Sequence, residues 1–115
     1  MREEVLVVTT PSVPGYRITK VLGIVYGMSI RTRGALGRFL AGLEALAGGR
    51  GYAYLQELKK ARDEALEELK RNARIRGANA VVSVDFETAE VLEGFIVVTA
   101  YGTAVIIEPE ASGGT

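Results

Sequence analysis

The chain has 115 residues, 48% of them hydrophobic, and its 14 basic side chains balance its 14 acidic ones. That length suits one domain, and the apolar share suits a globular core. The absence of cysteine and histidine excludes disulfides, thiolate nucleophiles, Cys/His zinc sites and imidazole base catalysis. A net charge of zero argues against a dedicated nucleic-acid binder, which needs a basic face to release counterions.

No apolar run of the kind found in secretion signals follows Met1, so we do not expect the chain to be secreted. The longest apolar runs, such as Phe95–Val98, are too short to span a membrane. We therefore expect a cytoplasmic protein with neither a membrane nor a nucleic acid as partner.

The first third of the chain predicts two strands. Glu3–Thr9 is rich in β-branched residues, and the turn-forming stretch 10–15 ends it. Tyr16–Ser29 predicts a long strand interrupted by Gly23 and Gly27. Glycine inside a strand indicates a bulge or a place where another backbone comes close.

The middle of the chain predicts two helices. Gly34–Ala47 carries apolar residues at steps of three and four, which make one stripe along a helix. Ala53–Arg76 shows the clearest helical spacing, with a charged face opposite its apolar stripe. Gly77 is well placed to end this second helix in a left-handed conformation.

The last third predicts strands at Ala80–Phe86 and Gly94–Ile107. The second of these is apolar on both sides, so both of its faces should be covered, and a second subunit would cover one of them. Thr103 and Ala104 would then lie at a subunit interface. The expected fold is α+β: a two-layer β-β-α-α-β-β subunit with a mainly antiparallel sheet. Residues 1–108 would form a single domain and residues 109–115 a flexible tail.

Several short segments together resemble the YbjQ-like family, which is also labelled a "putative heavy-metal-binding" domain. They occur in family order over residues 5–107. The resemblance implies a compact α/β subunit assembled into a ring-like homopentamer. The matching segments are Thr9-Thr10-Pro11, Pro14-Gly15-Tyr16, Leu22-Gly23-Ile24-Val25, Gly48-Gly49-Arg50, Tyr54 with Glu57-Leu58, Ala61-Arg62-Asp63-Glu64-Ala65, Gly77-Ala78-Asn79-Ala80-Val81 and Ala100-Tyr101-Gly102-Thr103-Ala104-Val105.

A metal site could use only oxygen ligands in this chain, because a soft metal is bound through thiolate or imidazole groups. Asp85 and Glu87 are the candidate ligands, and they would suit a hard cation such as calcium or magnesium. A ring could bring one carboxylate from each subunit together at its axis. The identity of any cofactor stays open.

An anion site is the alternative, at Arg31, Arg33 and Gly34, just before the first predicted helix. The interpretation we favour instead pairs these arginines with the acidic C-terminal segment across a subunit boundary. Tyr101 and Thr103 complete the candidate ligand-binding residues.

No nucleophile, base and acid are paired by spacing, so the sequence favours a protein that is not an enzyme. We expect a homo-oligomeric, pentameric protein that binds a small ligand or ion. The alternatives are an anion- or phosphate-binding or structural interaction module, and an enzyme whose site lies at subunit interfaces.

Overall fold

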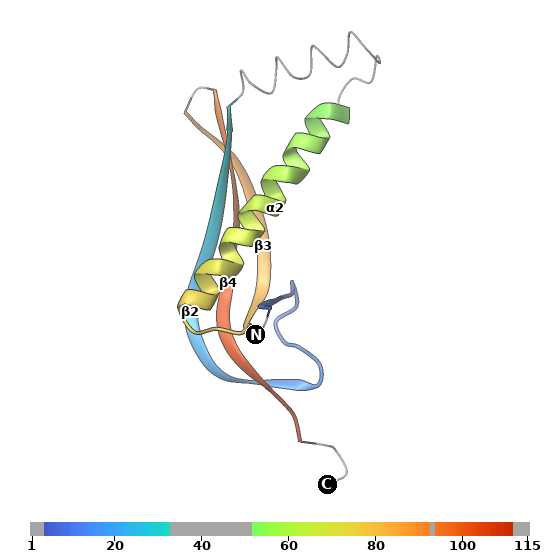
Figure 1. The fold of residues 1–115 in the computed structure, drawn as a ribbon, viewed down its shortest axis with the longest axis vertical. Coiled ribbons are helices and arrows are strands. Elements are labelled where there is room, and N and C mark those ends of the chain that lie inside the picture. Colours follow the sequence, from blue (N-terminus) through green and yellow to red (C-terminus); the bar gives the residue numbers. More distant parts are fainter. Residues whose placement is uncertain (1–3, 33–51, 93, 112–115) are drawn as a thin grey trace.

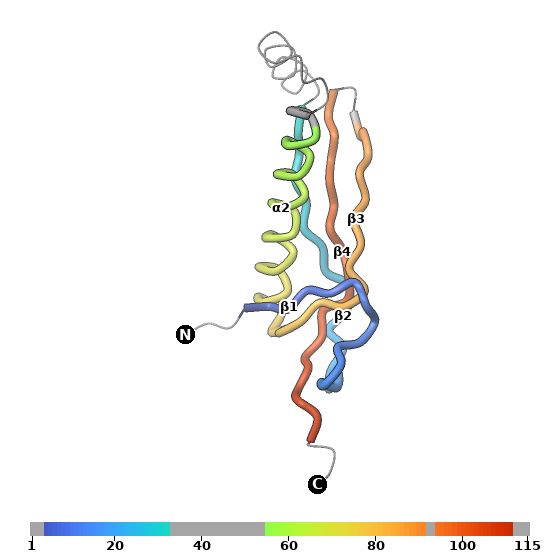
Figure 2. The backbone as a smooth tube through the Cα atoms, turned by 90° about the vertical axis from the view of Figure 1, so that its right-hand side faces the viewer, coloured from blue at the N-terminus to red at the C-terminus, as the bar shows by residue number. Residues whose placement is uncertain are grey.

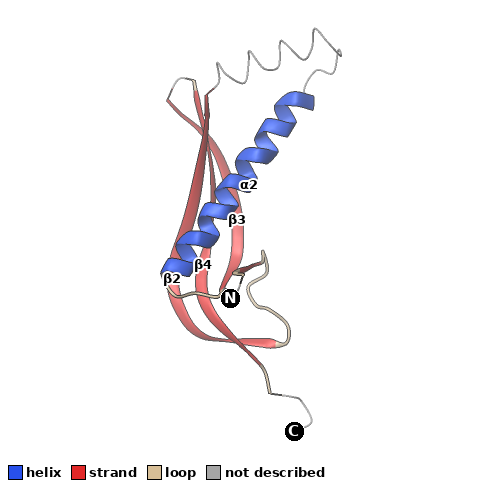
Figure 3. Cartoon of the chain, in the orientation of Figure 1, coloured by secondary structure: helices blue, strands red, loops and turns tan. Residues whose placement is uncertain are grey.

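A computed structural model describes residues 4–32, 52–92 and 94–111. Its elements follow the chain in the order β1 (Leu6–Val7), β2 (Tyr16–Thr32), α2 (Tyr52–Ile75), β3 (Ala80–Leu92) and β4 (Phe95–Pro109). In the part described, one helix lies against one face of a four-stranded sheet, which gives the two layers expected of an α+β fold (Figures 1 and 3). The helix predicted over 34–47 falls outside the described residues.

The strand order is β1-β3-β4-β2, so β4 lies between its two long neighbours. β2 and β3 both pair with β4 in antiparallel fashion, as expected. β1 differs, because it pairs with β3 in parallel and the sheet is therefore mixed. The predicted first strand is also shorter, at two residues, whereas β3 continues six residues past Phe86 because its pairing with β4 extends to Leu92.

The two glycines inside β2 have the two roles that the sequence offered as alternatives. Gly23 has a φ of +102°, and the register with β4 shifts between Val21 and Gly23, which marks a bulge. Gly27 lies under α2, and a Cβ atom there would collide with the helix backbone at Ala65 and Leu69. Gly27 thus lets the helix come into direct contact with the strand.

The core lies between α2 and the sheet. Ala61, Ala65, Leu69 and Ala73 have no exposed surface, and they face the strands at steps of four residues. Their strand partners include Val25, Val98, Ala100 and Ala104. Ala104 is therefore a core residue within one subunit, which corrects its expected place at an interface.

The predicted end of α2 is confirmed at Gly77, which has a φ of +91°. The amide of Gly77 donates to the carbonyl of Arg74, and the amide of Ala78 donates to that of Ala73. Beyond this turn, the Asn79 side chain both donates to and accepts from the Ile107 backbone, at 2.9 and 2.8 Å. This side chain fixes the start of β3 against the end of β4.

The face of the sheet away from α2 is covered only in part. Near the chain termini, Val13 packs on Val82, Val105 and Ile107. Figure 2 shows the N-terminal segment starting beside the C-terminal end of α2 and passing β3 to the opposite side of the sheet at this end. The remainder, which we call the open sheet face, carries exposed apolar side chains: Ile24, Tyr26, Met28, Ile30, Phe95 and Tyr101.

Candidate functional site

The structure brings four of the predicted candidates together on the open sheet face. Tyr101 on β4 lies opposite Asp85 on β3. Glu87 is two residues beyond Asp85 on β3. Thr103 is two residues beyond Tyr101 on β4, where it pairs with Val82 of β3. Asp85, Glu87 and Tyr101 are exposed and Thr103 is half-buried. Alternation along the strands places all four on one side of the sheet.

Arg31 lies apart from those four residues, since its side chain is on the side of β2 that faces α2. Its Nη1 and Nη2 contact the two carboxylate oxygens of Glu64 at 2.9 and 3.2 Å, and its Nε contacts Glu57 at 3.2 Å. The buried hydroxyl of Ser29 donates to Glu64 at 2.7 Å. Two carboxylates of its own chain therefore hold this guanidinium. Arg33 and Gly34, the other two anion-site candidates, lie outside the described residues.

Within one chain, Arg31 therefore pairs with acids of α2, and its expected pairing with the acidic C-terminal segment across a subunit boundary stays a prediction. The C-terminal segment instead meets Arg17 within the same subunit, where Glu108 lies 3.6 Å from the guanidinium. Both of those side chains are more than half exposed, so this ion pair adds little stability. Opposite charges at the two ends of the chain do meet, through β2 and β4.

The Arg31 cluster makes the stability of the fold depend on pH. The hydrogen bond from Arg31, followed by that from Ser29, lowers the pKa of Glu64 below the usual value for a glutamate. The same bond raises the pKa of Arg31. A carboxyl group with a lowered folded-state pKa contributes fully above its unfolded pKa, and this contribution is lost as the pH falls through the folded pKa.

Glu64→Gln should therefore unfold at lower urea concentration than the parent at neutral pH, by a small margin because Glu64 is largely exposed. The difference should shrink below about pH 4.3. Urea titrations at neutral and acidic pH, followed by circular dichroism, measure it. Glu67→Gln, whose carboxylate pairs with Lys70, is the matched control on the same helix. A gap between Glu64→Gln and parent that stayed constant with pH would contradict the assignment.

The outer edge of β2 is occupied by side chains of α2, which the sequence analysis did not predict. Glu68 accepts from the amide of Met28, and Asn72 donates to the carbonyl of Tyr26 at 2.8 Å. Arg76 donates to the carbonyl of Ile24 at 2.6 Å. The signal available in the sequence is the spacing of Glu68, Asn72 and Arg76 at four residues, directly beside the buried stripe.

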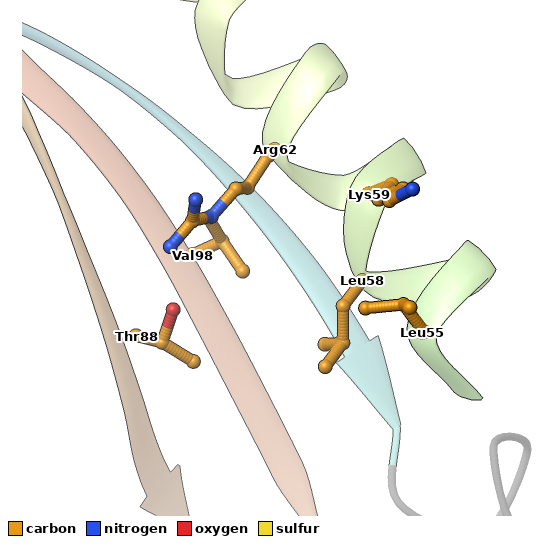
Figure 4. Close-up of a pocket in the computed structure, with 6 residues that line it drawn as sticks. All are labelled: Leu55, Leu58, Lys59, Arg62, Thr88 and Val98. Carbon is orange, nitrogen blue, oxygen red and sulfur yellow. The ribbon is translucent and has the colours of Figure 1, made fainter. Parts of the chain in front are cut away.

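A cavity of about 310 Å³ lies between α2 and the strands, on the other side of the helix from the Arg31 cluster; we call it the α2 pocket. Figure 4 shows its walls, in which side chains of α2 face residues of β3 and β4. The sequence analysis missed it, because nothing local shows that β3 and β4 come under this part of the helix. Its lining residues are Leu55, Leu58, Lys59, Arg62, Thr88 and Val98.

In the part of the chain that the structure describes, no three Asp, Glu, His or Cys side chains lie close enough together to hold a metal ion. Asp85 and Glu87 stand two residues apart on one strand and provide at most two carboxylates in one chain. Within the same described ranges, no helix has the length and apolarity needed to cross a bilayer.

Fold and surface together define a class: an α+β subunit with one sheet face covered by a helix and one open apolar face. The chain belongs to the YbjQ family, whose model, described as "Putative heavy-metal-binding", matches residues 5–108. The resemblance recognised in the sequence is thereby confirmed.

Relatives of similar length support this assignment. A UPF0145 protein of Methanoregula boonei is 47% identical over 96% of this chain and 92% of its own length. Another, from Bradyrhizobium sp., is 43% identical over 95% of this chain and 98% of its own. A crystal structure of a protein of unknown function from Pediococcus pentosaceus, assigned to the DUF74 family, matches with a TM-score of 0.61. It covers 90% of this chain and 98% of its own length at 19% identity, so it supports the fold alone.

Proposed function

We propose that this protein is a homo-oligomeric binding module, pentameric as its family resemblance implies, which holds a small ligand or ion. The open sheet face is the observation that carries the self-association. A second copy of the chain is the occupant that we assign to this face.

The apolar side chains of β2 form a continuous row on this face. Ile24, Tyr26, Met28 and Ile30 are 66%, 56%, 50% and 55% exposed, and they follow each other at every second residue. Tyr101 lies beside Tyr26 on the next strand and is 37% exposed. Exposed apolar groups that adjoin each other in this way mark interaction surfaces. Burying one such side chain completely stabilises by about 1.5–3 kcal/mol.

The occupied edge of β2 determines how a second copy would bind. Open strand edges associate by adding another strand, and proteins prevent this by covering them. Glu68, Asn72 and Arg76 already hold amide and carbonyl groups at this edge. Association through the open sheet face, side chain against side chain, is therefore favoured over extension of the sheet through β2.

Each side of the sheet offers one candidate site for the ligand or ion. On the open sheet face, Asp85 and Glu87 would be enclosed together with Tyr101 once a second copy covers the face. Carboxylates gathered from several subunits would suit a hard cation. On the helix side, the α2 pocket offers a cavity within a single chain.

Native mass spectrometry of the purified chain tests the assembly, with the pentamer as the expected species. Hydroxyl-radical footprinting of the same sample tests the interface. Met28 and Tyr26 should be labelled slowly in the assembly, despite their exposure in the single chain, whereas Tyr16, 42% exposed at the start of β2, should be labelled readily. A single-chain mass at micromolar concentration, or fast labelling of Met28 in an intact oligomer, would refute the proposed interface.

A further inference from the structure

The α2 pocket has an apolar part and a cationic part. Leu55 and Leu58 of α2 and Val98 of β4 form its apolar surface. Figure 4 shows the Arg62 side chain extending from α2 over the sheet, on the side of the pocket where Thr88 lies. A ligand that used the whole pocket would need both an apolar body and a group that accepts hydrogen bonds.

The two cations of the pocket differ from Arg31 in their surroundings. The Arg62 guanidinium carbon lies 4.8 Å from the centre of the Phe86 ring, a cation–π contact that helps to fix its position. Within the described ranges, no carboxylate pairs with Arg62 or with Lys59. Arg31, by contrast, has two carboxylates within 3.2 Å. The charge at the pocket is thus still available to an anion.

The size and the donors of the pocket limit the anion further. A volume of about 310 Å³ is at the small end of the range for ligand pockets. The planar guanidinium of Arg62 matches the two oxygens of a carboxylate, and the Thr88 hydroxyl on the same side of the pocket is a further donor. An unbranched aliphatic chain would lie along Leu55, Leu58 and Val98.

We propose that the α2 pocket binds a small aliphatic monocarboxylate, with its carboxylate at Arg62 and its chain against the two leucines of α2. This rests on the proposed function as a binding module, for which it names the ligand class. The site lies within one chain and on the helix side of the sheet, so it does not depend on the open sheet face.

Isothermal titration calorimetry with sodium octanoate tests the site on the unmodified protein. Octanoate should bind, and hexanoate should bind roughly tenfold more weakly, since each buried methylene contributes to affinity. Octylamine, which has the same chain and the opposite charge, should not bind. Two-dimensional NMR of the same complex should shift the amides of residues 55–62, 88 and 98 most strongly.

Two charge-removing variants on α2 complete the test. Arg62→Gln should lower octanoate affinity by about tenfold or more, because one charge-assisted contact is lost. Arg71→Gln removes the same charge from an exposed position outside the pocket and should bind octanoate within about twofold of the parent. Circular dichroism checks that both variants keep their helix content.

The proposal is overturned if octanoate does not bind, if octylamine binds equally well, or if the shifted amides lie on β2 and the open sheet face. Equal affinities of the parent and Arg62→Gln would also overturn it. Native masses of the same samples keep the two proposals separate. An intact oligomer that does not bind octanoate refutes only the proposed ligand of the α2 pocket. A single chain that binds octanoate refutes only the proposed assembly.

Discussion

Gly27→Ala should destabilise this fold by about 3 kcal/mol or more. The added Cβ would meet the backbone of α2 at Ala65, Glu68 and Leu69. Backbone cannot rotate out of the way as a side chain can, so the helix would have to move off the strand. Such a shift would also pull Asn72 away from the Tyr26 carbonyl and Glu64 away from Ser29.

Thermal unfolding followed by circular dichroism measures this effect, with a decrease in melting temperature on the order of 10 °C or more. Gly15→Ala is the matched control. Gly15 has a φ of +86° but no atom within 4 Å of a Cβ built there, so its substitution tests backbone strain without a clash. It should cost only about 1–2 kcal/mol. Equal losses at the two glycines would show that the helix does not lie as close to β2 as the structure has it.

Ile24→Lys should dissociate the proposed oligomer while leaving the single chain folded. Ile24 is 66% exposed on the open sheet face, so a lysine fits the isolated subunit without strain. In the assembly the same lysine would be buried against an apolar surface, and a buried charge without a partner costs several kcal/mol. Light scattering coupled to gel filtration measures the mass, and circular dichroism measures the fold.

Leu55→Lys is the control for this second experiment. It makes the same kind of change at a position that is 48% exposed, but on the helix side of the sheet. We expect that variant to keep the parent mass. If Ile24→Lys also kept the parent mass, or if Leu55→Lys dissociated instead, the interface would have to be assigned to another surface.

Several features of the fold follow from the sequence because they have local causes. The spacing of Ala61, Ala65 and Leu69 predicts a helix with one buried stripe, and the structure has it. Gly77 ends that helix because glycine tolerates a positive φ. Gly23 and Gly27 indicate a bulge and a close approach, and each occurs at one of them.

The surroundings of individual side chains were harder to predict, because they depend on which strands become neighbours. The apolar residues on both sides of β4 predict that both of its faces are covered; the structure covers one face with α2 and the other only in part, near Val13. The sequence pattern does not reveal that the face containing Ala104 is covered by α2 of the same chain. Thr103, one residue away, lies on the opposite face, and only the strand register distinguishes the two.

The candidate site shows the same division. Composition by itself excluded thiolate and imidazole chemistry, since no cysteine or histidine is present anywhere in the chain. The motifs in family order identified the family. Tertiary structure alone decided that Arg31 binds Glu57 and Glu64, 26 and 33 residues away, and that Arg62 lines the α2 pocket. The physical reason is that charges act through space over a few ångströms, whereas sequence patterns report neighbours only within one turn of helix or one strand.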